Sequence, residues 1–491
     1  MPRGPGVFPL RSWSGARQRH MSRSLGRERK YRSHLPIPEA GGRDTLSCQP
    51  RPNQSSIIDR NRITSIPCGD TLTSDQFGLD SAYNVYLREK SASAGLALGR
   101  ALRLSGHAEE AIRVVKELAD RVKEPFFRAQ IGIDMNYLGL FSQAETLLTQ
   151  AITELDHEPD LRILKVELAI SRYAQGRFRE AHTLSRRLRD AWSRAAIVSN
   201  IYQSSTVEYE KIVGKLLRFD ESAAGKRVLV IQEGGLGDVI MFSRYLHLLR
   251  DEGAQALVLQ APNTLAPVFS ALDWLTVVED ARSAIDQSDC VLCTFDLFVR
   301  YQATPYFPSY ADSYLQAPAG REMATRVADI FRNRPQGVRE IGLIWRSGTA
   351  VRHEPYRSIP LEQLAPLFGA PGSRFHALQF GTITEDEHAV LDKHGIGVMS
   401  DELTDLGDTA VILNKLDLLI TVDTGPAHLA GALGRPVWVL LSAACDERWS
   451  NSHRDTPWYR SMQLYRQATL GDWSRPISEM AEALSGGDAI G

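Results

Sequence analysis

Two short apolar runs, each followed by glycines and then by a helical pattern, most constrain the fold of this chain. The first run, residues 227–232, precedes Glu233-Gly-Gly-Leu-Gly-Asp238, and the second, residues 416–422, precedes Asp423-Thr-Gly-Pro-Ala-His428. A short, wholly apolar run such as the first is typical of a strand buried on both faces of a parallel sheet, and the second, apolar apart from Asp417 and Thr421, is expected to be another strand. Strand and helix patterns alternate around both runs, which favours doubly wound α/β folds.

This alternation occurs twice, so we expect two α/β lobes, at residues 222–335 and 336–485. The first lobe is predicted to hold strands at 227–232, 256–260 and 274–278 and helices at 239–250 and 264–272. The second is predicted to hold strands at 340–345, 374–380, 416–422 and 436–441 and helices at 361–368 and 429–433.

The glycines after the first run have a conformational role and a binding role. Gly234, Gly235 and Gly237 would let the chain turn sharply and let a ligand approach bare backbone at a helix N-terminus. The dinucleotide fingerprint G-x-G-x-x-G is not met, because its last position holds Ile240. A hydride-transfer enzyme is therefore disfavoured.

Asp238 is predicted to lie at the carboxyl edge of the first strand, where open α/β sheets place ligands. Its carboxylate is therefore a candidate functional group. The alternative is a structural carboxylate that accepts hydrogen bonds from the backbone at the start of the helix.

The turn after the second run is a predicted phosphate site. Asp423 ends the strand, Gly425 permits a tight turn, and the helix that follows would point free N–H groups into a cleft. Thr424 would act as a donor, and His428, one turn into the helix, would neutralise or hydrogen-bond a phosphate leaving group. The alternative is an ordinary capped helix with His428 packed inside.

Three arginines follow the first strand of the second lobe: Arg346, Arg352 and Arg357. A planar guanidinium donates two parallel charge-assisted bonds, which suits phosphate. Surface charge is the usual explanation for any single one of them.

Residues 76–215 are predicted to form helical hairpins. Segments around Gly106, Gly139 and Gly176 resemble one another, with glycine for the turn and alanine where two helices press together. Their period of roughly 35 residues resembles that of tetratricopeptide repeats, in which each hairpin hides its apolar face by stacking on the next. An unrelated helical bundle is the alternative. Such repeats would offer a concave surface that binds a partner or presents an acceptor.

Residues 1–75 are predicted to be a disordered basic tail, because their composition buries too little apolar surface to offset the ordering entropy. A wrongly included upstream start, with Met21 as another start, is one explanation. A targeting peptide or a tether to anionic lipid is another.

Composition narrows the function classes. The net charge of −2 gives no general attraction to nucleic acid or anionic membranes. No stretch has the ~20 apolar residues that cross a bilayer, so we expect a soluble or peripheral protein. Five cysteines are too few for a disulfide framework, and Cys290 and Cys293 are expected in a buried strand. A reducing cytoplasm is the predicted location, with a peripheral position at the inner membrane face as a variant of it.

Taken together, residues of about 225–480 resemble glycosyltransferase family 9, the heptosyltransferases of lipopolysaccharide core. The resemblance rests on the turns ending at Asp238 and His428, on Arg357-Ser-Ile-Pro-Leu361, and on the stretch from Trp438 through Tyr459. It implies the GT-B fold, in which two Rossmann-like lobes face each other across a cleft.

The resemblance also implies roles for individual residues. Asp238 matches the catalytic base, and Asp423, Thr424, Gly425 and His428 match residues that hold the nucleotide-sugar donor. Inverting chemistry without a metal or other cofactor is implied as well. Arg346 or Arg357 is expected to stabilise the leaving nucleoside diphosphate.

The helical repeats depart from this resemblance, because classical heptosyltransferases lack them. The departure leaves the sugar and the acceptor open, with glycan, lipid-linked and protein acceptors as candidates. Repeats ahead of a GT-B pair also resemble the protein O-GlcNAc transferases in architecture alone. The rival hypotheses are a protein glycosyltransferase whose repeats bind polypeptide, and a non-catalytic scaffold with a relic GT-B domain.

Overall fold

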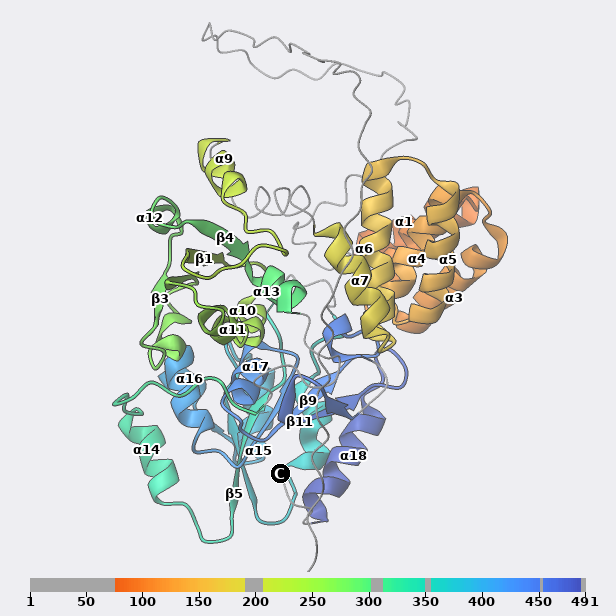
Figure 1. The fold of residues 1–491 in the computed structure, drawn as a ribbon. Coiled ribbons are helices and arrows are strands. Elements are labelled where there is room, and N and C mark those ends of the chain that lie inside the picture. Colours follow the sequence, from red (N-terminus) through yellow and green to blue (C-terminus); the bar gives the residue numbers. More distant parts are fainter. Residues whose placement is uncertain (1–75, 190–205, 302–311, 349–354, 451–453, 487–491) are drawn as a thin grey trace, which may run out of the picture. The chain divides into compact units, whose positions relative to one another are not determined.

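The computed structural model describes residues 76–189, 206–301, 312–348, 355–450 and 454–486 (Figure 1). They all fall within the second of the two units into which the chain divides, Asn61–Gly491. The predicted basic tail and Arg352 lie outside the described residues. None of the helices in these ranges is long and apolar enough to cross a bilayer.

The N-terminal part of the described chain is helical, as predicted. Its helices are α1 (Gln76–Glu89), α2 (Ala92–Leu104), α3 (Ala108–Arg121), α4 (Pro125–Tyr137), α5 (Phe141–Glu154), α6 (Glu158–Ala174) and α7 (Phe178–Leu188). The predicted turn glycines, Gly106, Gly139 and Gly176, all have positive φ, which glycine adopts without steric cost. The helical region is confirmed, while its assignment to the tetratricopeptide family stays a prediction.

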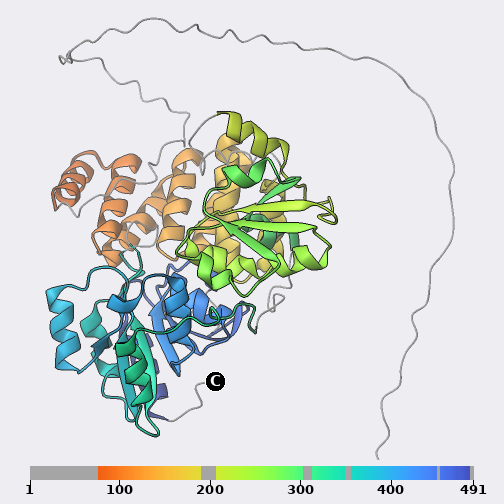
Figure 2. The ribbon, with the colours of Figure 1, turned by 90° about the vertical axis from the view of Figure 1, so that its left-hand side faces the viewer.

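The first lobe is built on a four-stranded parallel sheet of order β3-β2-β1-β4 (Figure 2). Its strands are β1 (Arg227–Ile231), β2 (Ala256–Gln260), β3 (Leu275–Val278) and β4 (Cys290–Cys293). Its helices are α9 (Thr206–Gly214), α10 (Leu236–Ser243), α11 (Leu246–Asp251), α12 (Arg282–Ile285) and α13 (Thr294–Tyr301), with the short 3-10 helix η1 (Ala266–Phe269). Cys290 and Cys293 are buried free thiols in β4, as predicted.

The second lobe is built on a seven-stranded sheet of order β10-β11-β9-β8-β5-β6-β7, parallel except for β10. Its strands are β5 (Arg339–Ile344), β6 (Ser373–Ala377), β7 (Gly397–Val398), β8 (Leu418–Val422), β9 (Val437–Leu441), β10 (Asp455–Thr456) and β11 (Tyr459–Arg466). Its helices are α14 (Thr325–Arg332), η2 (Leu361–Leu367), α15 (Glu385–Lys393), η3 (Ser400–Glu402), α16 (Leu406–Leu413), α17 (Gly425–Ala432), η4 (Glu447–Trp449) and α18 (Ser474–Ser485).

Four predicted elements differ in the structure. The helix expected at 239–250 is broken between α10 and α11, where the side chain of Arg244 turns into the core. The helices expected at 264–272 and 361–368 are the 3-10 helices η1 and η2, and η2 contains Pro366, which lacks the N–H of an α-helical ladder. The helix expected at 429–433 begins earlier, at Gly425.

Helices α10 and α17 pack against each other and join the two lobes. A Cβ atom on Gly237 of α10 would lie 2.6 Å from Cδ2 of His428 on α17, so this approach requires glycine. Beside this contact, the guanidinium of Arg244 donates to the carbonyl oxygen of Trp458 and lies over the rings of Tyr314 and Tyr459. Gly237 thus has a role in interlobe packing, and its predicted role in a turn or a ligand contact stays a prediction.

We predict that Gly237→Ala destabilises the protein by about 1–3 kcal/mol, because the added methyl group overpacks the contact with His428. Thermal unfolding of the full chain measures the effect. Gly214→Ala is the matched control, since a Cβ there meets nothing within 4 Å. Equal midpoints for the two variants would contradict the account of this contact.

Candidate active site

A pocket of about 1190 Å³ lies between the two lobes. The first lobe contributes mainly the turn at residues 235–238, and the second contributes residues that follow β5, β6, β8 and β9. These are carboxyl ends of parallel strands, where α/β folds bind ligands. No group of three or more His, Cys, Asp or Glu side chains within the described ranges is arranged to hold a metal ion.

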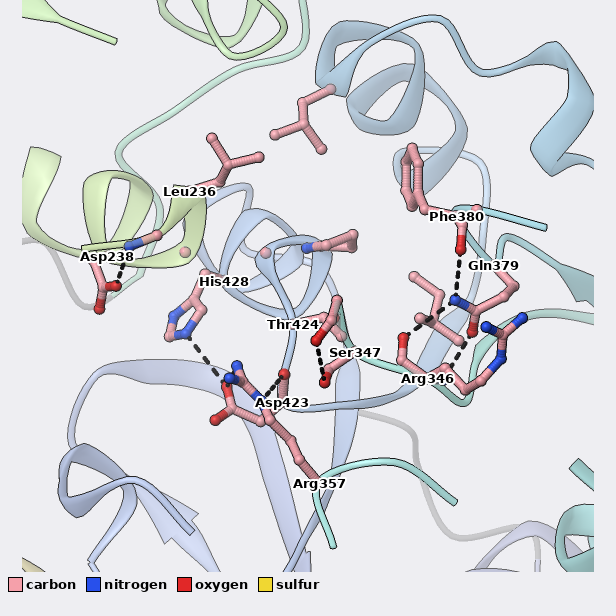
Figure 3. A pocket seen from close by; sticks show the side chains of 18 of the residues that line it. Leu236, Asp238, Arg346, Ser347, Arg357, Gln379, Phe380, Asp423, Thr424 and His428 are labelled. Atoms are coloured by element: carbon pink, nitrogen blue, oxygen red, sulfur yellow. Dashed lines mark hydrogen bonds and ion pairs between the residues drawn. The ribbon is translucent and has the colours of Figure 1, made fainter. Parts of the chain in front are cut away.

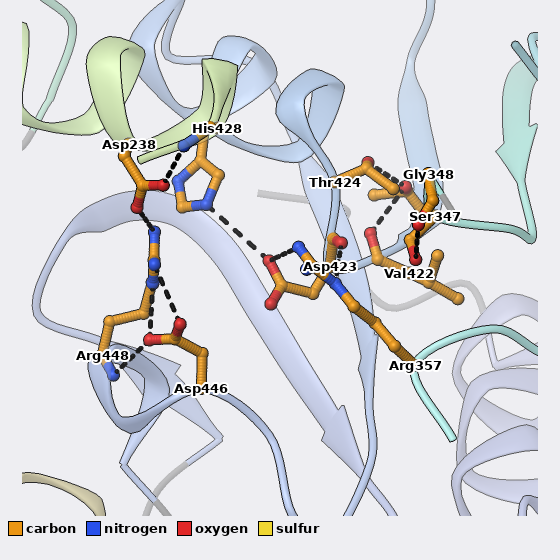
Figure 4. Close-up of polar contacts among 12 residues, drawn as sticks. Asp238, Ser347, Gly348, Arg357, Val422, Asp423, Thr424, His428, Asp446 and Arg448 are labelled. Atoms are coloured by element: carbon orange, nitrogen blue, oxygen red, sulfur yellow. Dashed lines mark hydrogen bonds and ion pairs between the residues drawn. The ribbon is translucent and has the colours of Figure 1, made fainter. Parts of the chain in front are cut away.

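Asp238, in the first turn of α10, has two sets of contacts. Its Oδ2 accepts a hydrogen bond of 2.7 Å from the N–H of Gly235, which is the structural role considered for it as an alternative. Its Oδ1 lies 2.6 Å from Nη1 of Arg448 at the wall of the pocket (Figure 4). Gly234 has φ +82°, and a Cβ there would lie 2.5 Å from the Asp238 carboxylate. The turn therefore needs glycine to seat this carboxylate.

Arg448 comes from the loop after β9 and was not foreseen from the sequence. Its Nε and Nη2 form a fork with Asp446, at 2.7 and 2.9 Å. Burial works against the charge of Arg448, but Asp238 and Asp446 raise its pKa well above the ordinary value. The available signal was the position of this Asp-Glu-Arg sequence after a buried strand, at the edge where ligands bind.

Asp423 directly follows β8 and is buried. Arg357 donates through Nε to the carbonyl oxygen of Asp423 at 2.6 Å, and its Nη2 lies 3.3 Å from Oδ1. Nε2 of His428 lies 3.7 Å from the same Oδ1. Burial opposes ionisation of Asp423, but Arg357 and His428 hold its pKa well below the usual range. Arg357 thus supports the end of the strand through Asp423.

His428 is packed inside the protein, as the structural alternative proposed, and also lines the pocket. It is only 2% exposed, its ring stacks on Trp449, and its Nδ1 shares a hydrogen bond of 2.9 Å with the Tyr459 hydroxyl. Burial lowers the pKa of His428 from 6.5, which favours the neutral ring. His428 was expected either to neutralise a phosphate leaving group or to hydrogen-bond it. A neutral, buried ring fits the hydrogen-bonding role better.

The N-terminus of α17 has no side-chain cap. Thr424 occupies the cap position, but no side-chain capping bond is made there, and its hydroxyl pairs with that of Thr421 at 2.9 Å. Thr424, Gly425 and Pro426 all line the pocket. The positive end of the helix dipole therefore faces the pocket, where it favours an anion.

Arg346 lies at the far end of the pocket from Asp238, with Thr424 between them (Figure 3). Its Nε and Nη2 form a fork with Glu387 at 2.8 and 3.0 Å. Gln379 and Phe380, which sequence reasoning missed, lie beside it. Arg346 is thus separated from the Asp238 end rather than grouped with it.

The helical region contacts the segments on both sides of the ion pair between Asp238 and Arg448. Arg189, just after α7, binds Glu233 through Nη2 at 2.6 Å and Asp296 through Nε at 3.0 Å. Glu233 directly precedes the glycine turn. On the second lobe, α6 packs against η4, which contains Arg448.

Comparison with known proteins identifies one segment of the chain. Residues 402–470 match the model of glycosyltransferase family 9 (heptosyltransferase). This match supports the assignment of this protein as a glycosyltransferase. The matching segment contains Asp423, Thr424, Gly425, His428 and Arg448.

Other similarities are more distant. Protein FlbA of Caulobacter vibrioides is 25% identical over an alignment of 284 residues that covers 53% of this chain and 46% of FlbA. The chain thus spans about half the length of this relative. A glycosyl transferase of family 9 from Veillonella parvula is 20% identical over 51% of this chain and 88% of that one, with a TM-score of 0.36. The E. coli heptosyltransferase WaaC with ADP-2-deoxy-2-fluoro heptose is 14% identical over 54% and 100%, with a TM-score of 0.34.

We predict that Arg189→Ala destabilises the full chain by about 3–5 kcal/mol, because it leaves the poorly exposed Glu233 and Asp296 carboxylates without their cation. Thermal unfolding measures the loss. Adding Glu233→Gln should restore part of it by removing one of the stranded charges. Arg187→Ala, an exposed change near the end of α7, is the control. An Arg189 variant as stable as this control would show that the ion pairs contribute little.

Proposed function

We propose that this protein is a glycosyltransferase that moves a sugar from a nucleotide-sugar donor to a hydroxyl group of an acceptor. The observation that carries the proposal is one pocket that presents Asp238 from the first lobe and the uncapped N-terminus of α17 from the second. A carboxylate can accept the proton of an attacking hydroxyl, and a helix N-terminus can bind a diphosphate. The family 9 match over residues 402–470 supports the same reaction class.

The order of groups along the pocket suggests how a donor would lie. The diphosphate would bind at Thr424 and Gly425, the sugar would extend toward Asp238, and the nucleoside would extend toward Phe380 and Arg346 (Figure 3). In this proposal Asp423 and His428 lie beside the diphosphate site and fix its shape. Arg357 holds Asp423 in place.

The proposed reaction is a single displacement that inverts the anomeric carbon. The acceptor oxygen forms a bond to that carbon as its proton passes to Asp238. The bond from the anomeric carbon to the diphosphate oxygen breaks, and the electron pair leaves with the diphosphate. The dipole of α17 would stabilise this developing charge, so the proposal includes no metal or other cofactor.

The finer assignments belong to the proposal as well. They are a heptose or hexose donor, an acceptor that is a glycan, lipid-linked or protein molecule, a role in bacterial cell-surface glycan, and a cytoplasmic location. Capture of a protein partner by the helical region is a further part of the proposal.

A panel of ADP, UDP, GDP and CMP should identify the nucleotide, because ligand binding to the native state raises its stability. We expect one base to raise the unfolding temperature of the full chain well above the others. His428→Ala should reduce that shift. A flat response to the whole panel would argue instead for a non-catalytic scaffold.

We predict that Asp238→Asn lowers sugar transfer or donor hydrolysis by about 10²–10⁴-fold, the range expected for loss of a general base. Nucleotide binding should be nearly unchanged, because the α17 N-terminus is intact. Asp273→Asn, an exposed position of the same lobe outside the pocket, is the matched control. Near-normal turnover of the Asp238 variant would remove this residue from the role.

A further inference from the structure

The Asp238 carboxylate is held by groups from both lobes. Oδ2 accepts from the Gly235 N–H of its own turn at 2.7 Å, and Oδ1 lies 2.6 Å from Nη1 of Arg448 in the second lobe. Two contacts on different oxygens fix the plane of a carboxylate. Each oxygen has a second lone-pair site, so Asp238 can still accept a proton from a third group.

Arg448 is itself held in place by contacts within the protein. Asp446 accepts from its Nε and Nη2, and Asp446 Oδ1 also accepts from its backbone N–H at 3.0 Å. The carbonyl oxygen of Arg448 accepts from the Trp458 indole at 2.8 Å. The side chain is only 16% exposed, so little freedom is left to the guanidinium.

The charges around Arg448 argue against a diphosphate as its partner. Its Nε and Nη2 are bound to Asp446, and Nη1 is bound to Asp238. A diphosphate brought to this guanidinium would meet two carboxylates at short range. The α17 N-terminus, on the other side of His428 from Asp238, offers an anion site without that repulsion (Figure 4).

We propose that Arg448 is a positioning residue that holds the Asp238 carboxylate in the orientation needed to accept the acceptor's proton. The inference rests on the proposed function, since it assigns Arg448 to the same step. Because Asp238 and Arg448 belong to different lobes, the base is correctly oriented only while the loop after β9 contacts the first lobe. Asp446 acts one step further away, by fixing Arg448.

A double-mutant cycle in the full chain tests this inference. Arg448→Met, Asp238→Asn and the double variant are compared by release of ADP, UDP or GDP from the matching nucleotide sugar. Arg448→Met should lower kcat by about 10²-fold, the cost expected for a misplaced catalytic group, with little change in the KM for the donor. In the Asp238→Asn background the same substitution should have little further effect, because its target is already lost.

Two further variants keep the test sharp if Arg448→Met folds poorly. Asp446→Asn keeps Arg448 but loosens it, and should give a smaller fall in kcat that also vanishes in the Asp238→Asn background. Arg475→Met removes an exposed arginine of α18 and should change neither parameter. Thermal unfolding of every variant separates a loss of fold from a loss of turnover.

Each outcome has one meaning. Additive losses in the cycle, or a large fall in nucleotide binding with kcat unchanged, would overturn the positioning role of Arg448. Near-normal turnover of Asp238→Asn alone would instead overturn Asp238 as the base, and with it that part of the proposed function. An unchanged kcat in both Arg448→Met and Asp446→Asn, with Asp238→Asn inactive, would overturn the inference alone.

Discussion

The close approach of α10 and α17 depends on Gly237, whose missing side chain makes room for the His428 ring. This contact joins the two sheets through the helices that follow β1 and β8. The pocket exists between the lobes because the carboxyl ends of both strands then face the same space. A side chain at Gly237 would separate the turn that carries Asp238 from the helix that carries His428.

Charge at the site is arranged in two buried clusters. Arg357 and His428 surround Asp423 at one, and Arg448 lies between Asp238 and Asp446 at the other. In both, an arginine is paired with a carboxylate from a distant segment, and Arg448 is also paired with Asp446 of its own loop. Buried ion pairs of this kind add little net stability but fix geometry, since breaking one leaves an uncompensated charge. The uncapped N-terminus of α17, which begins beside Asp423, attracts anions to the same pocket.

The helical region contacts the loops that form the site. Arg189 reaches the residue next to the glycine turn, and α6 packs on the loop that carries Arg448. Leu138 of this region also belongs to a buried cluster with Tyr356, Ala444 and Leu470 of the second lobe. The region therefore supports the loops of the site from outside the pocket, whichever acceptor the protein uses.

Local sequence determined the strands, the glycine turns and the helical hairpins. Short apolar runs fit only buried strands, and glycines such as Gly139 and Gly234 adopt backbone angles that are costly for other residues. For the same reason the apolar pattern places Asp423 and Thr424 directly after β8 and Asp238 in the turn and helix that follow β1. The α-helix predicted around Pro366 was wrong. The apolar residues there have helical spacing, but proline has no N–H to donate to an α-helical hydrogen bond.

Only the tertiary structure decided which of these residues meet. Arg448 and Arg189 lie far from Asp238 and Glu233 along the chain, so no local pattern identifies the carboxylates with which they pair. The packing of His428 under Gly237 and the separation of Arg346 from Asp238 likewise follow from how the lobes and loops come together. Strand ends are set by local apolar pattern and turn chemistry, whereas the partners of a buried charge are set by contacts between segments distant in sequence.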